Sequence, residues 1–128
     1  MTKYALVADD NDVVREFVGR ALHRLGYDTT IIECPPRDIS ACLHNDLVIT
    51  DYSMPGETGI SFAKRLREGG FEKPIVLITG DDDGIGGKHV LDAAKKSELF
   101  YRILKKPVNL NDIRSVLAAL SETEQLQV

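Results

Sequence analysis

The chain has 128 residues, of which 43% are hydrophobic and 28% charged, and its formal net charge is −4. This length accommodates one domain that buries roughly two thirds of its unfolded surface around one core, and it excludes a second folded module. The negative charge argues against nonspecific binding of nucleic acid by the whole surface.

The two cysteines, Cys34 and Cys42, are too few for a disulfide scaffold and fit no zinc-binding pattern. We therefore expect free thiols in a reducing compartment. The chain enters a strand directly, without a signal segment, and no apolar run approaches membrane-spanning length. These features predict a soluble, cytoplasmic protein.

Short apolar runs alternate with amphipathic helical patterns along the chain. Five strands are predicted, at residues 4–8, 29–32, 47–49, 75–78 and 101–104. Five helices are predicted, at about residues 12–25, 37–44, 60–68, 88–97 and 110–120. Strands that alternate with helices on short links predict a five-stranded parallel α/β sheet covered on both faces.

The first and last helices have clear end signals. Asn11 or Asp12 can cap the first helix and Gly26 suits its end, while Asn109 with Asp112 resembles a capping pair for the last helix. Apolar residues at helical spacing are expected to face the core. They are Val13, Val14, Phe17, Val18, Ala21, Leu22 and Leu25 in the first helix, and Leu110, Ile113, Val116, Leu117 and Leu120 in the last.

The stretch Gly80–Gly87 is rich in glycine and acidic residues, so it is not expected to be helical for most of its length. The helix after it is therefore predicted to start only near Lys88. We assign residues 1–120 to the folded domain and residues 121–128 to a polar, frayed tail.

Four of the predicted strands end in polar residues. Asp9 and Asp10 follow the first strand, Asp51 ends the third, Thr79 ends the fourth and Lys106 follows the fifth. In an open parallel sheet the carboxyl ends of the strands share one edge, where ligands bind. Singly, these residues could be helix caps, a loop carboxylate, a strand-end β-branched residue and a solvated charge. Jointly, they predict one pocket.

The pocket would bring three carboxylates together, those of Asp9, Asp10 and Asp51. A cluster that offers only oxygen ligands suits a hard cation such as Mg²⁺, which keeps several of its waters. The sequence therefore predicts a magnesium site next to Lys106 and Thr79.

These residues also form a recognisable combination over nearly the whole chain, from Tyr4 to about Leu120. Its parts are the acidic pair Asp9-Asp10, then Asp51-x-x-Met54-Pro55-x-x-x-Gly59, then Thr79, and finally Lys106-Pro107. The combination resembles the receiver domain of two-component response regulators. The resemblance implies a flavodoxin-like three-layer sandwich with strand order 2-1-3-4-5 and five helices on both faces.

The resemblance also implies roles for individual residues. Asp51 would be the phosphoacceptor, forming an acyl phosphate. Thr79 and Lys106 would contact phosphoryl oxygens, and the backbone carbonyl of Ser53 would join Asp9, Asp10 and Asp51 around the metal. Such domains commonly have a cis peptide bond at the position of Lys106-Pro107. The remaining motif residues would be structural, namely Met54, Pro55, Gly59 and Pro107.

The chain departs from the family pattern at the expected switch. Where most receivers have Tyr or Phe, three residues before the lysine, this chain has Ile103. Because strand side chains alternate, Tyr101 is predicted to point to the same side as Ile103 and to substitute in part. The residues that tune phosphoryl lifetime in the family would be Ser53 and Asp81.

The interval from Thr79 to Lys106 is also longer than is usual in the family. The excess lies in Gly80–Gly87, where ordering the backbone costs entropy. A phosphoryl group that pulls Thr79 inward could order this loop and shift the following helix. That shift would change a basic surface formed by Lys88, Lys95, Lys96, Arg102 and Lys105, although a merely solvated face is the simpler reading of this charge.

The leading functional hypothesis is a phosphorylation-controlled binding module, not an enzyme beyond its own phosphorylation and autodephosphorylation. A histidine kinase or phosphotransfer domain would be the donor. The downstream protein would bind the face formed by residues 88–97, 101–104 and the last helix, with no direct binding of nucleic acid or membrane. No output domain is expected after Leu120, so the chain is either a stand-alone receiver or part of a hybrid kinase or longer regulator.

Two alternatives come from other classes. A Mg²⁺-dependent aspartyl-phosphate phosphatase would need Asp-x-Asp after the first strand, which Ala8-Asp9-Asp10 does not match, and usually a cap domain. A receiver-fold scaffold that is never phosphorylated is disfavoured by the intact set of acids, threonine and lysine. The histidines fit no ligand pattern and are predicted on the surface; they are His23, His44 and His89.

Overall fold

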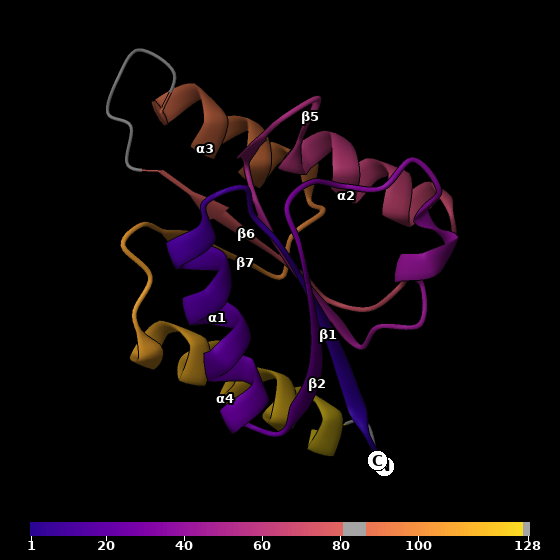
Figure 1. Cartoon of the computed structure of the whole chain (residues 1–128), viewed down its shortest axis with the longest axis vertical. Coiled ribbons are helices and arrows are strands. Elements are labelled where there is room, and N and C mark those ends of the chain that lie inside the picture. The colour runs from indigo at the N-terminus through magenta and orange to yellow at the C-terminus, as the bar shows by residue number, and fades with distance from the viewer. Residues whose placement is uncertain (81–86, 127–128) are drawn as a thin grey trace.

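The structure, a computed structural model, describes residues 1–80 and 87–126 (Figure 1). The strands are β1 (Lys3–Ala8), β2 (Tyr27–Ile32), β3 (Leu47–Asp51), β4 (Ser53–Met54), β5 (Glu57–Thr58), β6 (Ile75–Thr79) and β7 (Arg102–Lys105). The helices are α1 (Asp12–Arg24), the 3₁₀ helix η1 (Ile39–Cys42), α2 (Gly59–Glu68), α3 (Gly87–Ser97) and α4 (Leu110–Leu126).

Five of the strands form one parallel sheet in the order β2-β1-β3-β6-β7. This confirms the predicted order 2-1-3-4-5, because the small strands β4 and β5 form a separate antiparallel pair. Figure 1 shows α1 and α4 on one face of the sheet and α2 and α3 on the other. The molecule is therefore the predicted three-layer α/β sandwich.

Each face of the sheet has its own hydrophobic core, because successive strand residues point to opposite faces. Ala5 and Val7 of β1 pack toward α1 and α4, in a cluster with Val18, Leu22 and Ile113. The intervening residues pack toward α2, in a cluster with the side chains of Phe62 and Leu66; they are Leu6 and Ala8. All five residues of β3 and of β6 are buried, so the centre of the sheet is covered on both sides.

Local signals explain the ends of α1. The Asn11 side chain accepts a hydrogen bond from the Val14 N–H, and Gly26 after the helix has a φ of 100°. A positive φ is costly for residues with a Cβ, which is why glycine suits this position. The predicted apolar stripe is wrong at its outer margin, since Val13 is 78% exposed and Phe17 41% exposed. The stripe is wider than the part of the helix that the sheet covers; Leu110 at the start of α4 is exposed for the same reason.

The helix predicted at residues 37–44 is the second difference. Here the chain forms only the 3₁₀ helix η1, so the described residues contain four α-helices instead of five. Asp38 caps η1 through the Ser40 N–H, and the Asn45 side chain already donates to the Cys42 carbonyl. Because the next N–H, that of Asp46, bonds to Tyr4 of β1, there is room for one turn only.

The C-terminal helix is longer than predicted. α4 continues to Leu126, and so it includes most of the segment that the sequence predicted as a frayed tail. None of the helices within residues 1–80 and 87–126 combines the length and apolar character that a bilayer span requires.

Candidate functional site

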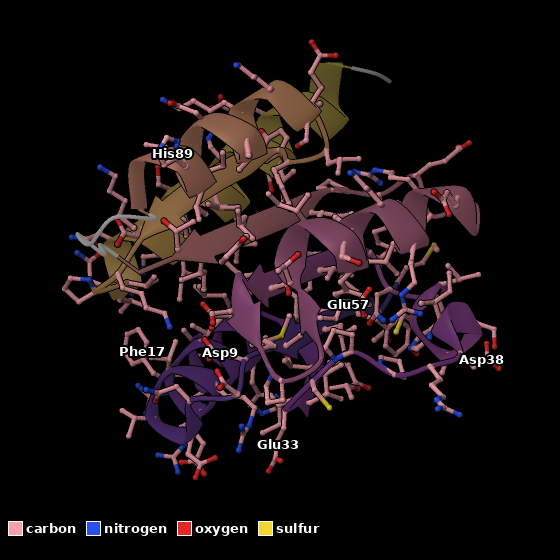
Figure 2. All side chains as sticks on the ribbon, turned by 90° about the horizontal axis from the view of Figure 1, so that it is seen from above. Asp9, Phe17, Glu33, Asp38, Glu57 and His89 are labelled. Atoms are coloured by element: carbon pink, nitrogen blue, oxygen red, sulfur yellow. The ribbon has the colours of Figure 1, made fainter. Side chains whose placement is uncertain are left out.

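The polar strand-end residues meet at the carboxyl edge of the sheet. Asp9, Asp51 and Thr79 are only 1%, 3% and 5% exposed, while Asp10 is exposed. One carboxylate oxygen from each of Asp9, Asp10 and Asp51 lies within 4.8 Å of the others. Figure 2 looks onto this end of the molecule and labels Asp9. The predicted convergence of the three acids is therefore present in the fold.

Lys106 supplies the positive charge nearest to these acids. Its Nζ atom lies 3.2 Å from Oδ1 of Asp51 and 3.9 Å from Oδ2 of Asp9. The first distance allows a charge-assisted hydrogen bond, whereas the second is a longer-range ion pair. A single ammonium group therefore faces two buried carboxylates and a third at the rim.

This arrangement perturbs both buried acids. Burial, and then the charge of Asp9, raise the pKa of Asp51 to about 6, although Lys106 opposes the shift. Burial also raises the pKa of Asp9, against the hydrogen bond that it accepts from the Asn11 N–H. Both ionised acids are thus destabilised at neutral pH, which is the condition that a bound cation would relieve.

The residues fit a divalent metal ion. Oδ2 of Asp9 is buried and has no hydrogen-bond partner among the described residues. A buried carboxylate oxygen without a donor is costly, so this atom is suited to coordinate a cation. Three carboxylates and no nitrogen or sulfur ligand match the preference of Mg²⁺ for oxygen.

The position of Asp51 depends on close packing behind it. The Tyr52 N–H bonds to the Ile78 carbonyl, and the Gly59 N–H returns to the Tyr52 carbonyl at 2.7 Å. A Cβ at Gly59 would overlap the backbone oxygen of Asp51, so only glycine fits there. Gly59 therefore lets α2 begin directly behind Asp51.

The segment between Asp51 and Gly59 connects β3 to α2. It is a short hairpin in which β4 and β5 pair through Ser53 and Thr58. Gly56 at its turn has a φ of 82°. Met54 is buried in the core on the α2 side, and Ser53 is exposed at the surface.

Thr79 and Lys106 are joined through the backbone. The Lys106 N–H donates to the Thr79 carbonyl at 2.8 Å, one step beyond the pairing of Thr79 with Lys105. The peptide bond between Lys106 and Pro107 is cis, as predicted. Both side chains are therefore held at the same edge as Asp51.

Sequence reasoning missed Arg15. This buried residue of α1 donates from Nη1 to the backbone carbonyl of Asp9 at 2.8 Å and forms ion pairs with Asp12 and Glu33. An arginine beside an apolar helical stripe has no distinctive pattern. Its spacing of three residues from Asp12 was the available signal for an ion pair.

The predicted switch residues are separated by the sheet. Ile103 of β7 is in register with Leu77 of β6, and residues in register point to the same face of the sheet. The residues on either side of Leu77 in β6 belong to the cluster on the α1 and α4 side, so Leu77 and Ile103 face the α2 and α3 side. Tyr101 packs instead against the cluster on the α1 and α4 side. The prediction that Tyr101 shares the side of Ile103 is wrong, because Tyr101 precedes β7 and does not follow its alternation.

Tyr101 is also distant from Thr79 along the sheet. Its N–H bonds to the carbonyl of Ile75, at the start of β6, whereas Thr79 ends that strand. Four residues of strand separate the two by roughly 13 Å. Tyr101 is therefore not placed to couple directly to the threonine.

Two parts of the predicted switch lie outside what the structure describes. One is residues 81–86 of the predicted loop, which include Asp81, and the other is the side chain of Lys88. The other members of the predicted basic surface are exposed. Arg102 stacks its guanidinium over the ring of Tyr101, 4.7 Å from the ring centroid. The exposed basic residues are Lys95, Lys96, Arg102 and Lys105.

The remaining predictions concern the histidines and the cysteines. The three histidines are exposed, as predicted; they are His23, His44 and His89. Both cysteines are free thiols, with Cys34 at the surface and Cys42 in the core.

Comparison with known proteins identifies the class that this fold and edge define. Residues 5–118 match the family model of the response regulator receiver domain, and the chain belongs to this family. Receiver domains pair with histidine kinases or phosphotransfer proteins, and Mg²⁺ and phosphorylation are general properties of the family.

The matched relatives differ in architecture. The chain is 26% identical to the two-component response regulator ARR6 of Arabidopsis thaliana over 96% of this chain and 72% of that protein. It is 31% identical to the autoinducer 1 sensor kinase/phosphatase LuxN of Vibrio harveyi, over 88% of this chain but only 13% of LuxN. A receiver domain structure from Clostridium thermocellum superposes with a TM-score of 0.77 at 20% identity, covering 98% of this chain and 99% of that one. The last similarity concerns the fold alone.

Proposed function

We propose that Asp51 is the phosphoacceptor of this receiver domain and that Asp9, Asp10 and Asp51, with the Ser53 carbonyl, hold Mg²⁺ during the transfer. The observation that supports this is the convergence of three carboxylates and Lys106 at one edge of the sheet. Among the described residues, the largest fully buried side chains are all apolar. Burying acids without a ligand would be unfavourable.

The transfer is a displacement at phosphorus. An oxygen of the Asp51 carboxylate forms a bond to phosphorus while the bond from phosphorus to the donor's histidine nitrogen breaks, and the electron pair leaves with the imidazole. When bound, Mg²⁺ supplies charge neutralisation for the transferring group. Lys106, 3.2 Å from Asp51, offers an ammonium group to the phosphoryl oxygens, and Thr79 offers a hydroxyl.

The donor in this proposal is a histidine kinase or a phosphotransfer domain. A mostly apolar groove of about 540 Å³ opens beside Lys106, lined in part by Phe17, Pro107 and Val108. Phe17 projects at this margin in Figure 2. An exposed apolar surface next to a reactive group suits a protein donor, which must bring its phosphohistidine to Asp51.

The downstream partner is a protein that binds the face formed by α3, β7 and α4. The exposed lysines and arginine of this face give it a positive charge that suits an acidic partner. We assign the chain to the cytoplasm, with no direct contact to nucleic acid or membrane. We assign it no catalytic activity beyond its own phosphorylation and autodephosphorylation.

The test is phosphorylation by a small donor. Intact-mass spectrometry of the protein with acetyl phosphate and Mg²⁺ should show one added phosphoryl group, which is absent without Mg²⁺ and absent in Asp51→Asn. Asp28→Asn, which changes an exposed acid of β2, is the matched control and should be modified like the wild type. A phosphoryl group that persists in Asp51→Asn would overturn the assignment.

A further inference from the structure

Arg15 is a buried cation at the start of α1, close to the acidic cluster but outside it. Its side chain is 10% exposed, and an arginine so enclosed requires partners for its donors and its charge. Nη1 donates to the backbone carbonyl of Asp9 at 2.8 Å in a buried hydrogen bond. Nη2 pairs with Asp12 and, at 3.8 Å, with Glu33.

The hydrogen bond from Arg15 is one of three that fix the position of Asp9. The Asp9 N–H donates to the Ile32 carbonyl of β2 at 3.0 Å, and its Oδ1 accepts from the Asn11 N–H at 2.9 Å. Arg15 binds the remaining backbone group, the carbonyl. Within the described part of the chain, Oδ2 is then the atom of Asp9 left without a hydrogen bond, and it faces Lys106.

The carbonyl matters because it belongs to the peptide that joins Asp9 to Asp10. A peptide unit is planar, so an anchor on the carbonyl oxygen also fixes the nitrogen and Cα of Asp10. Asp10 is exposed and lies at the rim, where packing does little to orient it. The direction of its carboxylate therefore depends on the peptide that Arg15 holds.

The positive charge of Arg15 is partly offset by its acidic partners. Asp12 and Glu33, which pair with its guanidinium, are both outside the metal-binding cluster. These two acids therefore reduce the repulsion that a bare guanidinium would exert on a bound cation. A lysine at this position would keep the charge but lacks the planar fork that reaches a carbonyl and a carboxylate together.

We propose that Arg15 is a positioning residue that orients the Asp9-Asp10 pair and thereby raises the affinity of the unphosphorylated protein for Mg²⁺. The inference rests on the metal site of the proposed function. Partners that orient metal ligands from outside the coordination sphere typically change metal affinity by about 10- to 100-fold when they are replaced.

The test is a Mg²⁺ titration followed by NMR, on protein that is fully folded under the conditions used. Arg15→Lys should raise the Kd by about tenfold or more. Arg15→Gln removes the charge as well, and its shorter side chain does not span to the Asp9 carbonyl. If orientation dominates, Arg15→Gln also weakens binding; if Arg15 acted only through its charge, Arg15→Gln would bind Mg²⁺ more tightly and Arg15→Lys would match the wild type.

The matched control is Arg67→Lys. Arg67 likewise donates to backbone carbonyls, those of Phe71, Lys73 and Leu99, but at the opposite end of the sheet. This variant should lose stability with an unchanged Kd for Mg²⁺, which separates a general structural effect from positioning. A Kd for Arg15→Lys equal to that of the wild type overturns the proposal, as does an equal increase in Arg67→Lys.

A further variant separates this inference from the proposed metal site. If Asp10→Asn binds Mg²⁺ as the wild type does, the metal site itself is wrong, whatever Arg15 does. If Asp10→Asn weakens binding and neither Arg15 variant does, the site stands and the role of Arg15 is rejected.

Discussion

The two ends of the central sheet differ in how their charged groups are paired, although each end has one buried side-chain oxygen without a hydrogen-bond partner among the described residues, Oδ2 of Asp9 and Oδ1 of Asn45. At the carboxyl end, Asp9 and Asp51 are buried with raised pKa values, and one carboxylate oxygen has no hydrogen-bond partner among the described residues. At the amino end, Arg67 satisfies three backbone carbonyls, and the Tyr4 N–H donates to Asp46. The buried charges at the carboxyl end are negative and can be relieved by a cation, whereas Arg67 at the amino end stabilises the fold through its hydrogen bonds to backbone carbonyls.

Gly59→Ala, at the carboxyl end, should cause the largest loss of stability and also slow phosphorylation. The added Cβ would overlap the Asp51 backbone oxygen and approach a methyl group of Leu77, and the buried backbone of β3 cannot yield. We expect a loss of about 3 kcal/mol in unfolding free energy together with slower phosphorylation. Urea denaturation and the acetyl phosphate assay measure the two effects.

The control for this variant is Gly26→Ala, at the amino end. Gly26 has a φ of 100° and nothing within 4 Å of its added Cβ, so the cost is backbone strain alone, about 1 kcal/mol. Its phosphorylation should be unchanged. Equal losses in the two variants would mean that the space behind Asp51 is not restricted.

Asp51→Asn should stabilise the metal-free protein at pH 7, by roughly 2 kcal/mol. Folding raises the pKa of Asp51 from 3.8 to about 6, so the folded state binds this proton more tightly than the unfolded state. Wild-type stability should therefore fall as the pH rises from about 4 to 6 and then level off. The variant should lack this part of the slope.

Urea denaturation in a chelating buffer across this pH range measures the difference. Added Mg²⁺ should recover stability in the wild type more than in Asp51→Asn, because the ion binds the folded state. Parallel pH profiles for the two proteins would show that the buried charge of Asp51 is not a source of instability.

Arg67→Met should cost about 1–2 kcal/mol at the amino end, since it keeps the apolar stem but removes the donors to three carbonyls. Phosphorylation of Asp51 should be unchanged. Thermal unfolding alongside the acetyl phosphate assay tests both statements. A large loss of phosphorylation in a folded variant would show that the amino end also affects the phosphorylation of Asp51.

Glu57→Gln should have the smallest effect, roughly 0.5–1 kcal/mol at pH 7. Glu57 binds Arg65 through both carboxylate oxygens, at 2.6 and 2.8 Å, and this pairing lowers its pKa. Because the pKa of Glu57 is lowered and that of Asp51 is raised, the two residues affect stability in opposite directions as the pH changes. The contribution is present above the unfolded pKa of about 4.5 and is lost as the pH falls through the lower folded value.

Comparing the wild type with Glu57→Gln in urea at pH 7 and at pH 3 measures this contribution. The difference between the two proteins should shrink toward pH 3. A difference that stays constant would mean that the ion pair contributes nothing through its charge.

The architecture was predictable because its signals are local. Apolar runs such as Leu47–Ile49 and Ile75–Ile78 mark central strands wherever they occur, and Asn11 caps α1 through a side chain only three residues from its donor. The strand-end acids were predictable for a related reason. Parallel strands share one carboxyl edge, so their order along the chain already places Asp9 and Asp51 together.

Other features depended on which elements meet. The chain between β2 and β3 forms only a 3₁₀ turn because Asp46 must pair with Tyr4 of β1, far away in the sequence. Tyr101 lies on the face opposite Ile103 because it precedes the strand whose alternation would have placed it. Val13 is exposed although it continues an apolar stripe, since the sheet covers only part of α1.

Arg15 shows the same limit at the site. Its spacing from Asp12 is visible in the sequence, but its bond to the Asp9 carbonyl and its approach to Glu33 require α1 to pack over the ends of β1 and β2. Hydrophobic period and turn chemistry act within a few residues and so can be read along the chain. The burial of a charge, and the partner that compensates it, are decided only when distant segments enclose it.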